Sequence, residues 1–382
     1  MINIPKHWKI KKLGEIGIFF KGKGVPKNKI TDTGFKCLTY GDLYTKYDFV
    51  IEGVKSFIDK ETALISQEIR YGDICFAGSG ETLEDIGKCA TFIDDEIGYA
   101  GGDIIVFRTE QNPIVMSYLL NSDIAKKQKF SMGQGHSVVH IYSSQLEMLK
   151  LPIPPLEEQE KIAEILLSCD KAIRLTTQII TQLKQRNQGL AQQLLTGEKR
   201  VKGFEKSVWK EVKLGELLDY EQPTNYLVKN TDYSDEYKIP VLTAGKTFIL
   251  GYTNEKEGIC TNIPLILFDD FTTDSRYIDF PFKVKSSAVK LLKTKKNVNL
   301  RFIFEAMKLI KYAIGGHERH WISKYAFLTI FVPSFKEQNA IAQILDTAHQ
   351  ELKLYEQKLQ LLQAQKKTLM QKLLTGEVLT LA

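Results

Sequence analysis

The sequence predicts two dissimilar mixed α/β (α+β) domains, separated by a long antiparallel two-helix coiled coil and related by an internal pseudo-two-fold duplication. Three observations predict this fold. A 45-residue helical segment beginning at Pro154 recurs at Pro333 without a gap, with 17 identical positions. A shorter motif beginning at Trp8 recurs at Trp209, with six of nine positions identical. The segments between these repeats differ from one another in length and sequence, so the framework is duplicated and the domains are not.

These repeats divide the 382-residue chain into four segments. We expect a first domain over residues 1–153, a helix over 154–198, a second domain over 199–332 and a second helix over 333–382. The apolar content of 43% and the charged content of 26% are ordinary for a globular protein. The sequence shows neither a leader pattern nor an 18-residue apolar stretch, and its five cysteines form no Cys-x-x-Cys pair. We therefore expect a cytoplasmic protein with reduced thiols.

Each domain contains short apolar runs bounded by glycine and aspartate, which are typical of strands. In the first domain, strand-like runs begin at residues 13, 36, 73, 89 and 103, and a helical pattern follows over 114–129. In the second domain, such runs begin at residues 237, 263 and 288, with a helix over 300–313. Both domains are therefore predicted to be mixed α/β.

Each long helix carries apolar residues in a seven-residue frame, the pattern of a coiled coil. A polar residue interrupts both frames at the same place, Asn187 in the first helix and Lys366 in the second. Ser334 with Glu337 fits a capping box, and Gly197 and Gly376 fit helix ends. The predicted core positions are Ile162, Leu166, Ile173, Ile180, Leu183, Leu190, Ile341, Leu345, Leu352, Leu359, Leu362 and Leu369.

The direction of the two helices follows from the duplication. Two similar halves that pack through the same surface form a self-complementary contact about a two-fold axis. An axis that crosses the helices makes them antiparallel and turns the two domains in opposite directions. Double-stranded DNA also has two-fold axes, so two domains related in this way could bind one duplex in inverted orientation. The helix pair is then expected to act as a spacer that sets the distance between two DNA-reading domains.

Basic residues gather in both domains. Residues 1–50 carry ten lysines and four acidic residues, and residues 281–304 carry seven basic residues and none that is acidic. Donor-rich, glycine-bearing segments lie before each long helix, at 131–140 and 315–321. Such features fit phosphate and base contacts. The predicted DNA-binding residues are Lys21, Lys23, Lys27, Ser79, Gln134, His136, Arg276, Lys283, Lys285, His317, Arg319 and His320.

No catalytic or metal-binding constellation is apparent. His136 and His140 are separated by a strand-like run, and His317 and His320 lack a second ligand pair, so no metal site is expected. The segment at 243–247 resembles the end of a phosphate-binding loop, but Pro240 occupies the position of its first glycine. Neither an adenine-methyltransferase motif nor a glycine-rich cofactor loop is found.

The repeated motifs resemble those of the specificity subunit of type I restriction–modification systems. The residues that carry the resemblance are the helix entries at 151–163 and 331–342, the LLTGE exits, the Trp-Lys starts, and the segments 133–142 and 317–324. The resemblance extends over essentially the whole chain.

The resemblance implies a non-catalytic subunit for host defence, in which each domain recognises one half of a bipartite, asymmetric DNA target. It implies that the coiled coil fixes the spacer and docks two adenine-methyltransferase (modification) subunits, with restriction subunits joining for cleavage. The duplicated pairs Glu158-Gln159 and Glu337-Gln338 are the expected docking residues. No cofactor is expected in this chain. S-adenosylmethionine, ATP and Mg²⁺ are expected on the partner subunits, and no membrane partner is expected.

Two other classes remain open at this stage. One is a nuclease or single-chain methyltransferase with an unrecognised site, which turnover by the purified chain would reveal. The other is a stand-alone coiled-coil DNA-binding regulator, which would not co-purify with a methyltransferase subunit.

Overall fold

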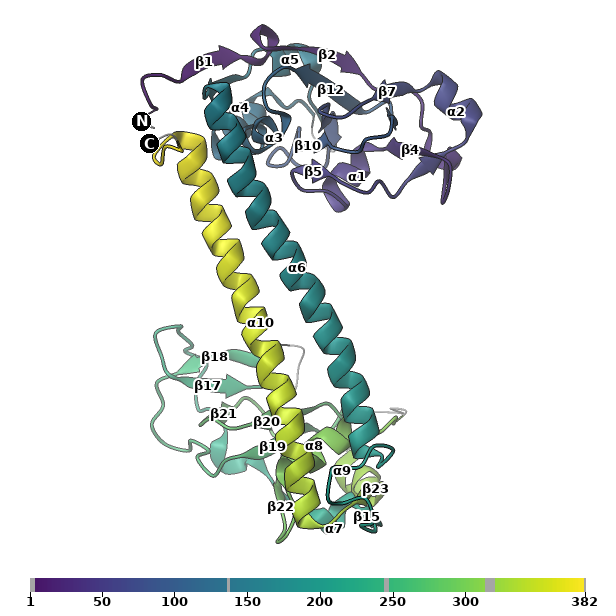
Figure 1. Ribbon diagram of the computed structural model, residues 1–382. Coiled ribbons are helices and arrows are strands. Elements are labelled where there is room, and N and C mark those ends of the chain that lie inside the picture. Colours follow the sequence, from purple (N-terminus) through teal and green to yellow (C-terminus); the bar gives the residue numbers. More distant parts are fainter. Residues whose placement is uncertain (1–3, 136–137, 244–246, 313–319, 381–382) are drawn as a thin grey trace. The chain divides into compact units, whose positions relative to one another are not determined.

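Both predicted long helices are present in the computed structural model, which describes residues 4–135, 138–243, 247–312 and 320–380. Helix α6 spans Leu156–Leu195 and helix α10 spans Phe335–Thr375 (Figure 1). Gly197 and Gly376 follow them with φ of 75° and 72°, the left-handed conformation that glycine adopts without strain. A β-carbon on Gly376 would lie 2.2 Å from Cγ of Pro5, so a close contact also requires glycine there.

The chain divides into two compact units. Unit 1 contains residues 1–177 and 358–382, and unit 2 contains residues 178–357. Each unit therefore combines one globular domain with one half of each long helix. The helices begin two residues inside the predicted segments, whereas the four functional segments themselves stay a prediction.

In unit 1, the halves of α6 and α10 pack side by side in antiparallel orientation. Ile162 and Leu166 of α6 share a buried cluster with Leu373 of α10. Further along α6, Asp170 pairs with Lys366. Residue numbers rise on one helix as they fall on the other, which is the antiparallel arrangement predicted from the duplication.

Unit 2 contains the same arrangement. Leu194 shares a cluster with Ile341, and the buried Asn187 donates from Nδ2 to the carbonyl oxygen of Ala348 at 2.9 Å. Both predicted polar positions, Asn187 and Lys366, therefore bond across the helix pair. Of the predicted core positions, six are buried and six are half-buried. The buried ones are Ile162, Leu166, Ile180, Leu183, Ile341 and Leu345; the half-buried ones are Ile173, Leu190, Leu352, Leu359, Leu362 and Leu369.

Of the two hydrogen bonds in the predicted capping box, the structure contains the one from the Glu337 backbone to the Ser334 side chain and not the reciprocal one from Glu337. The hydroxyl of Ser334 accepts a hydrogen bond from the backbone N–H of Glu337 at 3.4 Å. The Glu337 side chain does not return to cap the helix, because it is buried in a cluster described below.

The first domain is built on two five-stranded sheets, with strand orders β2-β12-β8-β10-β5 and β3-β6-β4-β11-β7. Strand β8, with the sequence ICFA, is buried on both faces and pairs with β10 and β12, so a continuous apolar run is needed there. The strands are β1 (Lys9–Lys12), β2 (Gly17–Lys21), β3 (Ile30–Thr31), β4 (Phe35–Leu38), β5 (Val50–Ile51), β6 (Phe57–Ile58), β7 (Gln67–Ile69), β8 (Ile74–Ala77), β9 (Ser79–Gly80), β10 (Cys89–Phe92), β11 (Gly98–Ala100), β12 (Ile104–Thr109), β13 (Val139–His140) and β14 (Lys150–Ile153).

The α-helices described in this domain are short: α1 (Tyr40–Thr45), α2 (Lys60–Ile65), α3 (Pro113–Leu120), α4 (Asp123–Met132) and α5 (Ser143–Glu147). The single helical pattern predicted over 114–129 is two helices. Asn121 interrupts it, because its side-chain amide donates to the carbonyl oxygens of Ser117 and Cys89 at 2.9 and 2.7 Å. At the other end, Asn112 caps α3 by accepting from the backbone N–H of Ile114 and Val115.

The second domain repeats this plan with fewer strands. Its sheets have the orders β16-β22-β19-β20 and β18-β17-β21, and the fully buried β19 takes the central role of β8. The strands are β15 (Lys210–Lys213), β16 (Leu218–Glu221), β17 (Ile239–Leu242), β18 (Ile249–Thr253), β19 (Leu265–Asp269), β20 (Ser275–Ile278), β21 (Lys283–Val284), β22 (Val289–Thr294) and β23 (Thr329–Val332). The short helices are α7 (Leu214–Leu217), α8 (Leu300–Lys308) and α9 (His320–Ser323).

Burial of the thiols leads to a simple prediction. Cys37, Cys75, Cys89 and Cys260 are buried, whereas Cys169 on α6 is half-exposed. Burial raises the pKa of Cys37 to about 12 and that of Cys89 to about 11, which removes the reactive thiolate at neutral pH. We expect one thiol of the native protein to react promptly with a disulfide reagent at pH 8, and all five after denaturation. Prompt reaction of several thiols in the native protein would contradict this packing.

Candidate nucleic-acid interface

The first domain has a small cavity of about 280 Å³, whose lining includes residues of β2, β9 and β13. Lys21 at the end of β2 lines it, together with Ser79 of β9 and His140 of β13. Strands β9 and β13 pair antiparallel with Ser79 opposite His140. The Ser79 hydroxyl lies 3.0 Å from Nδ1 of His140. Tyr142 completes the wall, with its ring 6.5 Å from the imidazole and nearly parallel to it.

Gln134 forms an isolated antiparallel β-bridge with His140. Its backbone N–H donates to the carbonyl oxygen of His140 at 3.0 Å, and the N–H of His140 donates back to Gln134 at 2.8 Å. Gly135 has φ of 122°, and a β-carbon there would lie 2.0 Å from the carbonyl oxygen of Val138, so the bridge needs glycine there. The side chain of Gln134 is exposed.

Three predicted DNA contacts, Lys21, Ser79 and Gln134, are thus brought together around His140. His140 itself was not among the predicted DNA contacts. His136 lies outside the described residues. Within the described part of the chain, no group of three potential ligands could hold a metal ion. Two features of the sequence could have identified His140. It lies close to the predicted contact Gln134, and it belongs to a strand-like run, which needs a partner strand.

Lys23 and Lys27 lie on the turn that follows β2, and both side chains are exposed. The backbone of Lys23 is held on both sides: its N–H donates to Ala100 at 2.9 Å, and its carbonyl accepts from Gln67 at 3.1 Å. The turn is therefore fixed while its ammonium groups face solvent. Such an arrangement suits phosphate contact, and these two assignments stay predictions.

The prediction that Lys283 contacts a DNA phosphate is wrong. Its side chain is 1% exposed, and its ammonium group donates to the carbonyl oxygen of Glu257 at 2.6 Å and pairs with Glu255 at 2.8 Å. Moving it to a phosphate would leave the Glu255 carboxylate unpaired in a largely buried place. Lys285, two residues on, is exposed. Arg276 is exposed as well, paired with Asp274 at 3.0 Å.

The basic run at 281–304 is largely neutralised by acidic residues from elsewhere in the second domain and from α10. A count of charge along the sequence could not reveal these partners. The ion pairs are Lys283–Glu255, Lys290–Asp270, Lys293–Glu221, Lys295–Asp219 and Arg301–Asp346. The run is therefore weaker evidence for a DNA surface than its composition indicated.

His320 is also wrong as a base contact, because its side chain is fully buried. Its backbone N–H donates to the carbonyl oxygen of Asp270 at 2.9 Å, and the N–H of Trp321 donates to the Asp270 carboxylate at 2.8 Å. Lys290, also buried, lies 3.4 Å from that carboxylate. His320 thus anchors the end of the predicted recognition segment. His317 and Arg319 lie outside the described residues.

The four predicted docking residues are buried and bonded within the chain, which corrects that assignment. Glu158 is 2% exposed, and accepts from Nε1 of Trp8 at 3.0 Å. Nε2 of His7 lies 2.5 Å from its other oxygen. Gln159 is 0% exposed; it accepts from the backbone N–H of Asn112 at 2.8 Å and donates to the carbonyl oxygen of Pro154.

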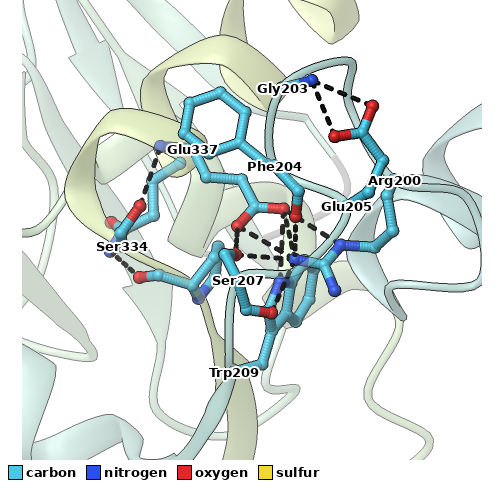
Figure 2. Close-up of polar contacts among 10 residues, drawn as sticks. Arg200, Gly203, Phe204, Glu205, Ser207, Trp209, Ser334 and Glu337 are labelled. Atoms are coloured by element: carbon cyan, nitrogen blue, oxygen red, sulfur yellow. Dashed lines mark hydrogen bonds and ion pairs between the residues drawn. The ribbon is translucent and has the colours of Figure 1, made fainter.

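Unit 2 repeats these contacts. Glu337 accepts from the guanidinium of Arg200 at 2.9 Å and from the indole N–H of Trp209 at 3.3 Å. Figure 2 shows these contacts together with the bond from Ser207. Gln338 accepts from the backbone N–H of Asn299 at 2.9 Å and donates to Pro333 at 3.0 Å. These side chains are buried and bonded within the chain, which leaves little of their surface for a partner protein. They fasten the helix entries to the domains.

The two sequence repeats are therefore partners of one another. Strand β1, which begins after Trp8, pairs antiparallel with β14, which leads into α6. Strand β15, which begins after Trp209, pairs in the same way with β23, which leads into α10. The tryptophan motif and the Glu-Gln motif recur together because they meet in each unit. Their joint recurrence is the sequence signal that could have identified the Glu-Gln pairs as internal contacts.

Comparisons with known proteins agree with this geometry. The family model described as "Type I restriction modification DNA specificity domain" matches residues 5–185 and 206–364. The Escherichia coli EcoR124I/EcoR124II specificity subunit is 47% identical over 146 residues, which cover 35% of this chain and 36% of that protein. The putative MjaX specificity subunit of Methanocaldococcus jannaschii is 26% identical over 407 aligned positions, covering 98% and 94%.

The fold is similar to that of a solved S subunit from M. genitalium, with a TM-score of 0.66 at 17% identity, covering 97% of this chain and 96% of that one. An HsdS subunit from Thermoanaerobacter tengcongensis aligns with a TM-score of 0.51 at 18% identity, covering 98% of each chain. Among the described residues, no helix has the length and apolar character needed to cross a membrane. Because the family model matches twice and covers most of the sequence, the chain belongs to the family of type I restriction–modification DNA specificity subunits.

Proposed function

We propose that this chain is the non-catalytic specificity subunit of a type I restriction–modification complex, with each domain reading one half of a bipartite, asymmetric double-stranded DNA target. The observation that carries the proposal is a duplicated framework holding two dissimilar domains. Both units use the same tryptophan, glutamate and glutamine contacts, whereas the sheets and exposed side chains differ. Two domains that are held in the same way but expose different side chains are expected to recognise two different DNA half-sites.

In this proposal the antiparallel helix pair fixes the spacer between the half-sites and docks two modification subunits. S-adenosylmethionine, ATP and Mg²⁺ belong to the partner subunits, and a restriction subunit joins for cleavage. The purified chain alone is expected to methylate and cleave nothing. A stand-alone regulator is the alternative, and failure to co-purify with a modification subunit would favour it.

Docking must use other residues than the buried Glu-Gln pairs, and two leucines are suited to it. Leu175 of α6 is 46% exposed and Leu354 of α10 is 65% exposed. They stand at equivalent positions of the two repeats and are among the 17 identities. Neither side chain is buried in the core of its unit, so packing within the chain does not explain why both repeats have leucine there. Two equivalent exposed leucines are what two copies of the same partner protein would need. We assign them to modification-subunit docking.

In the first domain, Lys21, Ser79, Gln134 and His140 are the proposed DNA contacts. Lys21 supplies a phosphate contact at the mouth of the cavity, and the Ser79–His140 pair and Gln134 supply groove contacts. The Ser79–His140 pair is not assigned to catalysis, because it lacks a paired orienting carboxylate of the kind seen in hydrolytic triads among the contacts described for it.

The Lys21→Gln variant tests this surface. Loss of one phosphate contact should weaken binding to all sequences and reduce the slope of log affinity against log salt concentration by about one unit. The measurement is binding by the purified chain with its modification partner, to a target obtained by selection from random duplexes. Lys60→Gln, an equal charge change at an exposed position of α2, is the control. Equal losses from both variants would remove Lys21 from the contact surface.

The same selection tests the proposed function itself. We expect the enriched duplexes to share two different short motifs separated by a fixed number of unspecified bases. Enrichment of one uninterrupted motif, or of none, would contradict two-domain recognition.

A further inference from the structure

A cluster in unit 1 that contains none of the predicted DNA contacts fastens the first domain to both long helices. We name it the Tyr118 junction; it consists of Phe49, Tyr118, Asp170 and Lys366. The hydroxyl of Tyr118, on α3, donates to the carboxylate of Asp170 on α6. The ammonium group of Lys366, on α10, pairs with the other oxygen of the same carboxylate. One carboxylate therefore ties the domain to both helices.

Aromatic packing closes the Tyr118 junction. The rings of Phe49 and Tyr118 stack with centroids 4.2 Å apart, and the ammonium group of Lys366 lies 4.4 Å from the Phe49 centroid. Tyr118 is fully buried, and its burial together with the Asp170 hydrogen bond raises the pKa of its phenol. Charge-assisted hydrogen bonds and a cation over an aromatic face are each directional, so the cluster resists rotation of the domain about the helices.

Unit 2 has a junction with different chemistry, two of whose residues stand at positions equivalent to Tyr118 and Asp170. Gln159 and Gln338 make the same bond to the caps Asn112 and Asn299, which aligns the two units. Counting from these anchors, Glu305 stands where Tyr118 does, and His349 stands where Asp170 does. Two chemically different sets of groups thus occupy one place in the duplicated frame.

We name the second cluster the Glu305 junction; it consists of Arg301, Glu305, Asp346 and His349. Arg301 on α8 pairs with Asp346 on α10 at 2.6 Å and with Glu305 at 3.3 Å. Its guanidinium also lies 3.3 Å from Nδ1 of His349. Glu305 is 3% exposed. The second domain is therefore fastened to α10 by charged groups.

None of the junction residues is among the DNA contacts proposed above, and each is bonded to other residues of its own unit, so base recognition gives no reason for the junctions. Adding one base pair between two half-sites rotates one relative to the other by about 35° and moves it by about 3.4 Å. A domain that could rotate freely relative to its helices would reorient to bind the displaced half-site. A domain held by directional contacts would not.

We propose that the Tyr118 and Glu305 junctions are positioning sites that determine how strictly the protein discriminates the length of DNA between its two half-sites. This inference rests on the proposed function. The junctions hold each domain at one angle on the helix segments of its own unit, so a target of altered spacing must break them to bind. Half-site sequence preference comes from the DNA-facing residues and is independent of them.

The test uses the full chain with its modification partner and duplexes whose spacer is one base pair shorter than, equal to, or one longer than the selected one. Tyr118→Phe keeps the buried ring and removes the hydroxyl; Asp170→Asn keeps the shape and removes the charge. For each variant we expect the preference for the selected spacer over its neighbours to fall by about fivefold, the effect of losing one coupling of about 1 kcal/mol. The preference for the half-site bases should stay unchanged.

Glu164→Gln, an exposed charge change on the same helix, is the control and should keep wild-type spacing preference. Lys366→Gln provides a third junction variant should one of the others fail to fold. If the folded junction variants bound all three spacers with wild-type ratios, or lost affinity equally for all three, the inference would be overturned. A wild-type complex that selects no bipartite target would instead refute the proposed function.

Discussion

Replacement of Glu337 by alanine is expected to destabilise unit 2 by about 3–5 kcal/mol, the usual cost of removing one partner of a buried charged pair. The carboxylate is 0% exposed and receives Arg200, Ser207 and Trp209 (Figure 2). Without it, the guanidinium and indole N–H would remain in place with their main acceptor gone. The midpoint of thermal unfolding, followed by circular dichroism, should fall by roughly 10 °C.

Two variants make this result specific. Lys336→Ala changes the exposed neighbour on the same helix turn and should leave the midpoint unchanged. Glu337→Gln keeps one acceptor oxygen without the charge, so its loss should be smaller than that of alanine. A Glu337→Ala protein that melts with the wild type would show that this cluster does not hold the helix entry to the domain.

Replacement of both Leu175 and Leu354 by aspartate is expected to abolish co-purification with the modification subunit. A leucine buried at an interface contributes about 2 kcal/mol, and a carboxylate buried without a partner costs more, so the affinity of each site should fall by at least about a hundredfold. The single variants should each retain one docked subunit, because the two sites are equivalent. Mass photometry of the co-expressed proteins would count the bound subunits.

The control for this experiment is Leu156→Asp with Phe335→Asp, a second pair of exposed apolar residues at equivalent positions of the two helices. These lie at the helix entries, away from the proposed docking surface, and should leave the number of bound subunits unchanged. Full occupancy in the Leu175→Asp, Leu354→Asp double variant would place the docking surface elsewhere.

The frame of the molecule could be predicted from the sequence because it depends on local signals and on symmetry. Proline and glycine mark the ends of the helices, so the bounds of α6 and α10 were placed within a few residues. The antiparallel direction followed from the duplication alone. The capping role given to Glu337 was wrong, since Arg200 and Trp209 bind its carboxylate from a segment that precedes α10 by more than a hundred residues.

The site residues were harder to predict, because their roles depend on which way a side chain faces. Lys283 and Lys285 belong to one basic run, yet Lys283 is buried in β21 beside Glu255, whereas Lys285, just beyond that strand, is exposed. Glu158 and Glu337 are acidic residues near exposed helix starts, and nothing local indicates that a tryptophan from a distant segment covers them. Repetition shows that such residues matter, but it does not distinguish an internal contact from a docking contact.

Sequencing of methylated adenines in a host that expresses this chain with its modification subunit tests the central claim most directly. The account predicts one asymmetric motif, with two different specified halves separated by a constant number of unspecified bases, and methylation that is lost when this chain is omitted. Methylation at a single continuous motif, or at the same sites without the chain, would contradict it.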